Sequence, residues 1–238
     1  MQNPEKNFQT SQKFYDEVYY KRLDTEQLIT KHYRSLAKRL NIQAQQQILD
    51  IACGTGGWLL TCQQLGATPY GIDISEKAIT FCKEVMAKDH FHVADAEQLP
   101  FADNSFDVIT CLGSLEHFRD QKVAIKEILR VAKTNAKIVI SVPNSGFLTR
   151  RLGLYQGTQQ ADYLELVLSL SEWQSLFEVN GLQLLQRWKD LHVCNWKWIK
   201  QNGWAQVPLR LLQAALLPLW PLSWQYQVYH LCTKKSAK

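Results

Sequence analysis

Short apolar runs alternate with helical patterns between residues 47 and 142, and this alternation limits the possible folds more than any other feature of the 238-residue chain. The strand-like runs are Gln47–Ile51, Pro69–Ile74, His90–Ala94, Phe106–Leu112 and Ala136–Val142. The helical patterns between them are Trp58–Leu65, Glu76–Ala87 and Asp120–Val131. Strands that are apolar on both faces and joined by single helices indicate a doubly wound α/β fold, which binds ligands beyond the carboxyl ends of its strands.

Further elements flank this series. Residues Thr10–Leu40 have the pattern of one or two amphipathic helices. The sequence Ser171-Glu172-Trp173-Gln174 predicts a capping-box start to a helix that ends at Asn180-Gly181. Two more strand-like runs follow, at Leu182–Leu191 and Trp224–Thr233.

The first strand-like run passes directly into a glycine-rich turn, in the sequence Ile48-Leu-Asp-Ile-Ala-Cys-Gly-Thr-Gly-Gly-Trp58. Such a turn lets a ligand approach the backbone closely, and the helix that follows offers it free N–H groups. Asp73 lies near the end of the second run, where an acid accepts hydrogen bonds from ribose hydroxyls in doubly wound folds. An NAD(P)-linked oxidoreductase would also use this acid. That alternative is weakened because Leu59 replaces the third glycine of the dinucleotide fingerprint.

The third run leads into Val93-Ala-Asp-Ala-Glu-Gln-Leu-Pro-Phe101. With this segment, the chain from Ile48 to Pro143 resembles the class I S-adenosylmethionine-dependent methyltransferases, specifically the small-molecule subgroup that includes the ubiquinone and menaquinone methyltransferases. The resemblance implies a Rossmann-like, mostly parallel seven-stranded sheet with helices on both faces and an antiparallel last strand. It also implies N-terminal helices and a helical insertion before the last strand.

The resemblance implies S-adenosylmethionine as cofactor and S-adenosylhomocysteine as product. The glycine turn would lie against the methionine portion, Asp73 would hold the ribose diol, and Asp95 would accept from the adenine amino group. The family turn usually begins with Gly where Ala52 stands, although Ala-Cys-Gly is common in quinone-type members. The expected cofactor-binding residues are Asp50, Ala52, Cys53, Gly54, Gly56, Asp73, Ile74, Asp95, Ala96 and Leu112.

The fourth run continues into Gly113-Ser-Leu-Glu-His-Phe118. Enzymes that methylate exocyclic amines of bases carry an Asn/Asp-Pro-Pro-Tyr-type motif at this position, whereas Leu-Glu-His resembles the quinone-type motif. His117 is the candidate catalytic base for a phenol or alcohol, with capping or packing before the helix at Asp120 as an equal alternative. Part of the subgroup has a metal-site Glu where Gly113 stands, so no metal is expected. Arg150 and Tyr155 are candidate acceptor-binding residues.

Composition limits the partners and the compartment. The net charge of +5 resides in residues 1–40 and in the tail after Thr233, so nucleic-acid binding is not expected. The six scattered cysteines indicate reduced thiols, and the amino-terminal segment lacks an export signal, so we expect a cytoplasmic protein. Arg210 and several prolines interrupt the tryptophan-rich second insertion, which excludes a membrane span. Peripheral membrane contact through residues 205–224, a cap over an apolar acceptor pocket, and a core or dimer contact remain alternatives, and the oligomeric state is open.

The sequence therefore predicts an enzyme that transfers a methyl group to a small, hydrophobic or aromatic acceptor, with O-methylation favoured over N- or C-methylation. The alternative is a non-catalytic protein of the same fold that binds S-adenosylmethionine or a partner. We expect an N-terminal helical cap over residues 1–40 and a methyltransferase domain over 41–238. Within that domain, 47–143 forms the cofactor half, and 143–170 and 192–223 are acceptor-side insertions.

Overall fold

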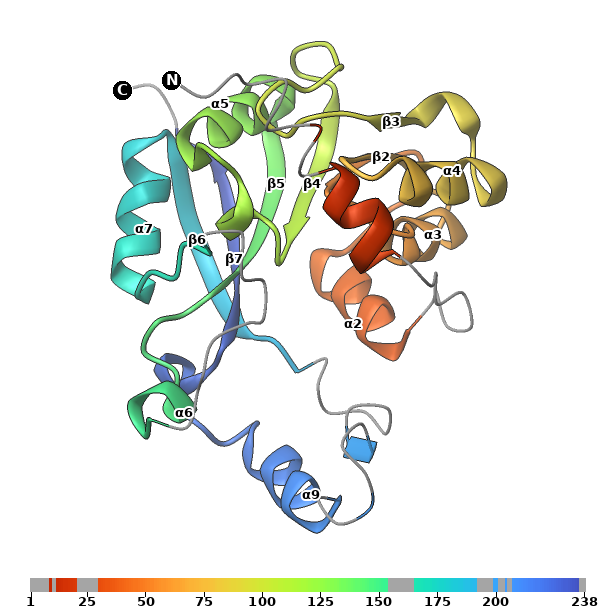
Figure 1. Cartoon of the computed structure of the whole chain (residues 1–238). Helices are drawn as coiled ribbons and strands as arrows, with labels where there is room; N and C mark the ends of the chain where they lie inside the picture. Colours follow the sequence, from red (N-terminus) through yellow and green to blue (C-terminus); the bar gives the residue numbers. More distant parts are fainter. Residues whose placement is uncertain are drawn as a thin grey trace.

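The computed structural model describes residues 9, 12–20, 30–153, 165–191, 199–200, 204 and 207–235. Its centre is a seven-stranded sheet in the order β3-β2-β1-β4-β5-β7-β6 (Figure 1). The strands are β1 (Gln47–Ile51), β2 (Thr68–Asp73), β3 (Phe91–Val93), β4 (Phe106–Leu112), β5 (Ala132–Pro143), β6 (Leu182–Lys189) and β7 (Gln227–Lys234). The pairs among β1 to β5 are parallel, and β7 is antiparallel to both β5 and β6. The predicted doubly wound sheet with an antiparallel last strand is confirmed.

Helices cover both faces of the sheet, as the apolar strands require. One face carries α2 (Lys31–Leu40), α3 (Gly57–Gln64) and α4 (Glu76–Val85), and the other carries α5 (Gln121–Val131) and α7 (Leu170–Val179). The shorter helical turns are η1 (Tyr15–Tyr19), η2 (Lys88–His90), η3 (Leu115–His117), α6 (Leu148–Arg151) and η5 (Leu222–Trp224). The remaining helix, α9 (Val207–Leu216), lies beyond the carboxyl-terminal edge of the sheet in Figure 1.

Several predicted boundaries shift by a few residues, and two of these shifts have a clear local cause. The capping box of α7 begins at Ser169, not at Ser171. Ser169 Oγ accepts from the backbone N–H of Glu172, and Glu172 Oε2 accepts from the backbone N–H of Ser169. Serines at both positions made the two starts indistinguishable by pattern. The last strand starts at Gln227, three residues later than predicted, and η5 ends at Trp224, the residue predicted to open the strand.

The described cysteines are buried, and no disulfide joins any two of them. They are Cys53, Cys62, Cys82, Cys111 and Cys232. Cys194 lies outside the described residues. Among the helices that the structure describes, none is both long enough and apolar enough to cross a membrane.

Gly71 fixes the packing of β2 against α3 and β3. A Cβ at this position would lie 2.8 Å from Cys53 Sγ and 3.0 Å from both Leu59 Cδ1 and Phe91 Cδ1. All three neighbours are buried, so they have little room to move. Gly71→Ala is therefore expected to lower the free energy of unfolding by about 1–3 kcal/mol, measured by urea denaturation.

Gly153→Ala is the matched control for this substitution. A Cβ on Gly153 meets no described atom within 4 Å, so only its positive φ of 68° opposes the change. We expect a cost of about 1 kcal/mol from the left-handed backbone alone. If Gly71→Ala cost no more than this control, the packing argument would be wrong.

Candidate functional site

The predicted cofactor-binding residues gather at one edge of the sheet. β1 pairs in parallel with both β2 and β4, and β2 pairs with β3, so their carboxyl ends meet at the same edge. Asp50 lies in β1 immediately before the turn, Asp73 ends β2, and Leu112 ends β4. Asp95 and Ala96 follow β3. The structure thus brings together residues that several intervening elements separate in the sequence.

The turn between β1 and α3 has a backbone that favours glycine. Ala52, Gly54 and Gly56 have φ angles of 58°, 53° and 73°. The left-handed Gly56 is the N-cap of α3, so the first N–H groups of this helix face the turn. Ala52 adopts the same conformation at a steric cost that glycine avoids. The turn therefore has the strained geometry of a ligand cradle.

Asp73 connects this turn to the next strand end. Its Oδ2 accepts from the backbone N–H of Gly54, and its Oδ1 accepts from that of Ser75, both at 2.9 Å. The side chain is buried, and this burial raises the pKa of Asp73 above its ordinary value. Each carboxylate oxygen has a second lone pair for a ligand hydroxyl, so the geometry suits a ribose diol.

The N-terminal turn η1 contacts this edge, a feature that the sequence did not specify. Ser75 Oγ donates to Asp16 Oδ1 at 2.5 Å, and Lys77 Nζ donates to the Asp16 carbonyl at 2.6 Å. Tyr20 lies close enough to Gly54 that a Cβ there would be 2.9 Å from its hydroxyl oxygen. Figure 1 shows this segment beside β2 and α4. The segment therefore covers part of the glycine turn.

Asp50 forms a second buried acid next to the turn. Its Oδ1 accepts from Thr110 Oγ1 at 2.5 Å, which links β1 to β4. Burial raises the pKa of Asp50 to about 7. The hydrogen bond from Thr110 lowers this pKa, and the nearby charge of Asp73 raises it by a smaller amount.

This raised pKa predicts a pH-dependent effect of Asp50→Asn. The unfolded chain releases the Asp50 proton near the ordinary aspartate pKa of 3.8, whereas the folded chain retains it up to about 7. The wild type therefore loses stability as pH rises through this window, by an amount on the order of a few kcal/mol. The Asn variant lacks this loss, so it is expected to equal the wild type near pH 4 and to exceed it near pH 8. Urea denaturation at both pH values checks this. The same difference at both would contradict it.

Asp95 is engaged with a cation in the structure. Arg119 donates to Asp95 Oδ2 at 2.5 Å and contacts Glu97 Oε2 at 3.3 Å. The other oxygen, Asp95 Oδ1, accepts from the backbone N–H of Glu97 at 2.9 Å. Ala96 is buried and Ile74 is half-buried at the same edge. The acid predicted to read adenine thus already has two partners, and Arg119 is one that the sequence did not reveal.

His117 belongs to a polar group at the carboxyl end of β4. Asp120, not His117, caps α5, because its Oδ1 accepts from the backbone N–H groups of Lys122 and Val123. The Nδ1 of His117 is buried and has no hydrogen-bond partner in the described part of the chain. Burial lowers the pKa of His117, although the charge of Glu165 opposes this. A neutral imidazole at ordinary pH is the form that can accept a proton.

Three residues that the sequence did not single out as functional complete this group. Tyr226 donates to Glu165 Oε1 at 3.1 Å. Gln227 Nε2 lies 3.4 Å from Glu116 Oε1, and Gln227 Oε1 accepts from Ser141 Oγ at 3.1 Å.

Glu116 itself is 1% exposed, and burial raises its pKa to about 8. Its Oε2 has no partner among the described residues. A protonated Glu116 can donate a hydrogen bond to a ligand oxygen. The group therefore combines a neutral base with a neutral acid.

Glu116, His117 and Glu165 each offer a donor atom within 4.8 Å of the others, which is also a spacing that could hold a metal ion. Of the two residues predicted to bind the acceptor, Arg150 is exposed on α6 and Tyr155 lies outside the described residues.

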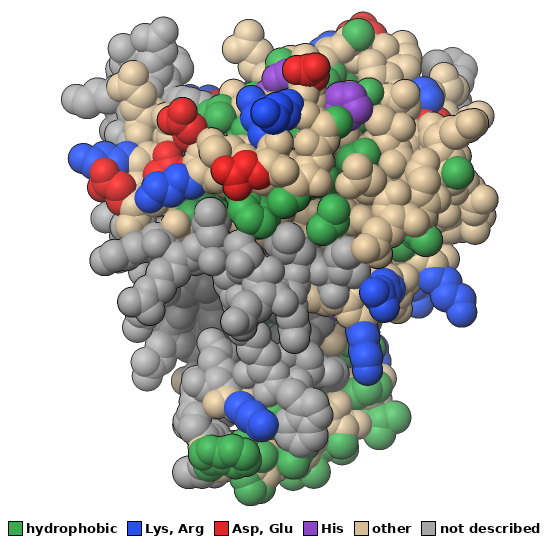
Figure 2. Space-filling view, turned by 90° about the vertical axis from the view of Figure 1, so that its right-hand side faces the viewer, with side chains coloured by type: hydrophobic (Ala, Val, Ile, Leu, Met, Phe, Trp, Pro, Cys, Tyr) green, Lys and Arg blue, Asp and Glu red, His purple; other side chains and the backbone are tan. Residues whose placement is uncertain are grey.

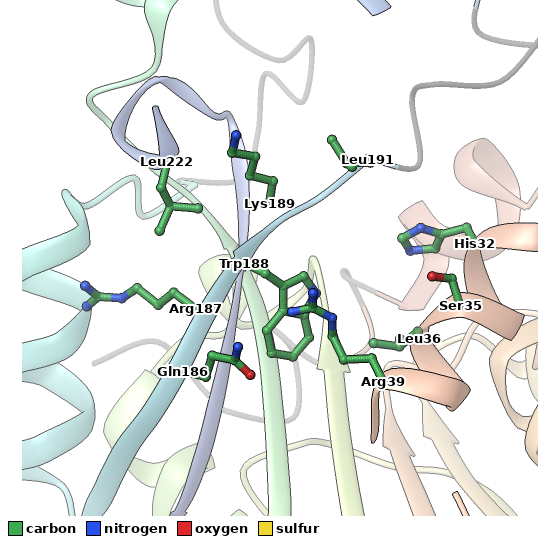
Figure 3. A pocket seen from close by; sticks show the side chains of 10 residues that line it. All are labelled: His32, Ser35, Leu36, Arg39, Gln186, Arg187, Trp188, Lys189, Leu191 and Leu222. Carbon is green, nitrogen blue, oxygen red and sulfur yellow. The ribbon is translucent and has the colours of Figure 1, made fainter. Parts of the chain in front are cut away.

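A separate groove lies between α2 and β6 (Figure 3). Its volume is about 480 Å³, and none of the predicted cofactor residues lines it. Trp188 stacks on Tyr229 with parallel rings, and the Arg39 guanidinium lies 4.7 Å from the Trp188 ring centre. In Figure 3, Arg39 and Trp188 face each other across the groove. This contact ties the outer helix to the edge of the sheet.

Comparisons with known proteins match the chain to methyltransferases. Residues 49–140 match the family model described as "Methyltransferase domain". The uncharacterized methyltransferase YcgJ of Bacillus subtilis is 30% identical over 178 residues, which cover 71% of this chain and 70% of YcgJ. A demethylmenaquinone methyltransferase of Clavibacter sepedonicus is 32% identical over 183 residues, covering 74% of this chain and 72% of that protein.

A solved structure shows the same fold at lower identity. It is a complex between the Haloferax volcanii Trm112 methyltransferase activator and a protein described as a methyltransferase. The match has a TM-score of 0.67 and 17% identity, and it covers 86% of this chain and 90% of the other.

Proposed function

The chain belongs to the class I S-adenosylmethionine-dependent methyltransferases, and on that premise we propose that it methylates a small, hydrophobic or aromatic acceptor of the quinone type, at oxygen in preference to nitrogen or carbon. The observation that carries the proposal is the pair of buried Glu116 and half-buried His117 at the carboxyl end of β4. The relative named demethylmenaquinone methyltransferase supports an acceptor of this class.

The cofactor would lie along the edge formed by β1, β2, β3 and β4. The turn from Ala52 to Gly56 approaches its methionine portion, and Asp73 accepts from the ribose hydroxyls. Asp95 and Ala96 flank the adenine, with Ile74 and Leu112 packed on its sides. These groups suit a ligand without phosphates, since the turn contains no Lys or Arg. The Arg119–Asp95 ion pair holds the adenine end of this edge in place.

His117 would act as the base for the acceptor hydroxyl. Methyl transfer is an in-line displacement, so the enzyme chiefly aligns the oxygen, the methyl carbon and the sulfur. A neutral imidazole removes the hydroxyl proton as the oxygen attacks the methyl carbon. The carboxylate of Glu165 stabilises the imidazolium that results, and Tyr226 holds that carboxylate in place. The Glu116 carboxyl can bind the acceptor's second oxygen.

The test is methyl transfer from labelled S-adenosylmethionine to a panel of hydroquinones, catechols, long-chain alcohols and aromatic amines. Mass spectrometry detects the product, and NMR locates the new methyl group on oxygen, nitrogen or carbon. Transfer to an aromatic oxygen supports the proposal. Cofactor binding without transfer to any acceptor would favour a non-catalytic binding protein.

The proposed reaction requires no metal, since Gly113 stands where part of the subgroup has a metal-site Glu. Turnover is therefore expected to survive dialysis against EDTA unchanged. Loss of turnover that Mg²⁺, Mn²⁺ or Zn²⁺ restores would instead assign a metal to Glu116, His117 and Glu165, whose donor atoms lie within 4.8 Å of one another.

A further inference from the structure

The helix α9 turns its apolar side chains toward solvent. The exposed residues along it and just beyond it are Pro208, Leu211, Leu212, Ala215, Leu216 and Leu219. Successive members are one or three residues apart, so they form one stripe along the helix. Leu212 is 57% exposed and Leu219 is 79% exposed. A surface helix in water ordinarily packs such a stripe inward and exposes polar residues, so α9 has the opposite arrangement.

The stripe forms part of a larger apolar end of the molecule. Trp204, which is 77% exposed, precedes the helix. Figure 2 shows hydrophobic side chains gathered at the end of the molecule where Figure 1 places α9, with a Lys or Arg side chain beside them. Contiguous apolar surface of this kind marks an interaction site.

The charge of the surrounding sequence indicates the partner. Residues 191–224 contain three cationic residues, Lys197, Lys200 and Arg210, and no Asp or Glu. Lys200 Nζ lies 5.1 Å from the centre of the Trp204 ring, so a cation adjoins an exposed aromatic side chain. A second copy of the chain docked through this end would bring like charges together. An anionic lipid surface would neutralise them and would also bury the leucines.

Hydrogen bonds fix the orientation of this end. Gln225 Nε2 donates to the Leu217 carbonyl at 3.0 Å, and Lys189 Nζ donates to the Pro218 carbonyl at 2.5 Å. Asn144, which follows β5, donates to the carbonyls of Ser223 and Gln225. The helix is thus held beyond the carboxyl-terminal edge of the sheet, at the end of the molecule that carries the glycine turn (Figure 1).

We propose that α9, together with Trp204 and Leu219, docks this protein on the surface of an anionic membrane. The helix lies in the interface between headgroups and acyl chains, with its leucine stripe toward the lipid. Lys200 adds electrostatic attraction to the headgroups. Docking in this orientation turns the carboxyl-terminal edge of the sheet toward the lipid, where an apolar acceptor would be dissolved.

Vesicle flotation of the full chain tests the proposal. The vesicles contain either phosphatidylcholine alone or phosphatidylcholine mixed with phosphatidylglycerol. We expect wild type to float with the mixed vesicles, and to do so less at high salt. Leu212→Glu combined with Leu219→Glu is expected to lower the partition coefficient about tenfold or more, because charge replaces buried apolar surface. Val179→Glu, at a valine that is 84% exposed on α7, is the matched control and is expected to float like wild type.

Three outcomes would overturn the proposal. In the first, the wild type remains in solution with both kinds of vesicle, and in the second, the double variant floats as well as wild type. In the third, wild type is a dimer, the double variant is a monomer, and neither floats. That result would assign the surface to contact with a second copy of the chain. The assay contains no cofactor and no acceptor, so its failure leaves the proposed methyl transfer untouched.

Discussion

Replacing Asp73 with alanine is expected to weaken the binding of S-adenosylmethionine about 100-fold, because the variant loses hydrogen bonds from two ribose hydroxyls to a charged acceptor. Asp73 ends β2 and contacts the glycine turn through the N–H of Gly54. Isothermal titration calorimetry of the ligand-free protein with S-adenosylmethionine measures the change. An unchanged dissociation constant would remove Asp73 from the ribose site.

Asp107→Ala is the matched control for this prediction. Asp107 is in β4 but near its amino-terminal end, where it accepts from the N–H of Gln47 and from Lys133 Nζ at 2.8 Å. It lies at the opposite edge of the sheet from Asp73. We expect this control to retain wild-type affinity. Because the carboxylate of Asp73 also holds the turn, thermal unfolding without ligand should accompany the titration, and Asp73→Asn keeps the size of the side chain.

His117→Ala is expected to lower kcat by about 10²- to 10⁴-fold with little change in KM, which is the usual range for loss of a general base. Burial lowers the pKa of His117 below its ordinary value of 6.5, so the imidazole of the wild type is still mostly neutral at pH 6.5. Wild-type turnover should therefore stay level as pH falls to about 6.5 and should drop only at lower pH. In the variant, this acid-side drop should disappear.

His92→Ala controls for the loss of an imidazole elsewhere on the sheet. His92 is in β3, where its ring packs edge-on against Phe101. We expect the turnover of His92→Ala to be within a factor of about two of wild type, because His92 does not belong to the group around His117. Full turnover of His117→Ala across the pH range would show that the acceptor loses its proton to water or to another side chain.

The cofactor edge could be predicted because its signals are local. Each parallel strand is a short apolar run, and its binding residues follow directly in the sequence, as Asp73 follows Ile72. Neighbouring parallel strands end at the same edge, so adjacent local patterns are sufficient to assemble the site. Every predicted strand has a counterpart in the structure, with shifts of a few residues at the ends. The assignment of individual residues to the cofactor stays a prediction.

The acceptor side could not be predicted because its contacts connect distant segments. Glu165 lies far from Tyr226 in sequence, and neither belongs to a recognisable motif. Gln227 reaches the site because β7 is antiparallel to β5 and pairs it with Pro143. An antiparallel last strand begins at the edge where the parallel strands end. The predicted antiparallel direction of the last strand therefore implied that the first residues of this strand border the site.

The ion pair between Arg119 and Asp95 illustrates the same limit on a smaller scale. The acid was identified from the pattern that follows the third strand. The arginine belongs to the loop before α5, which carries no pattern beyond the Asp120 cap. Local sequence predicts which side chain contacts a ligand, but it does not predict which cation approaches that side chain after folding.

The position of β7 between β5 and β6 determines the order in which the protein can be completed during synthesis. Strand β6 has no neighbour in the sheet until β7 emerges from the ribosome, since β7 is the strand that it pairs with. A nascent chain that ends after β6 can assemble the parallel half with its glycine turn, but it lacks Tyr226 and Gln227. Pairings over such sequence separations are slow to form. The proposed acceptor side can therefore close only after the parallel half has been synthesised.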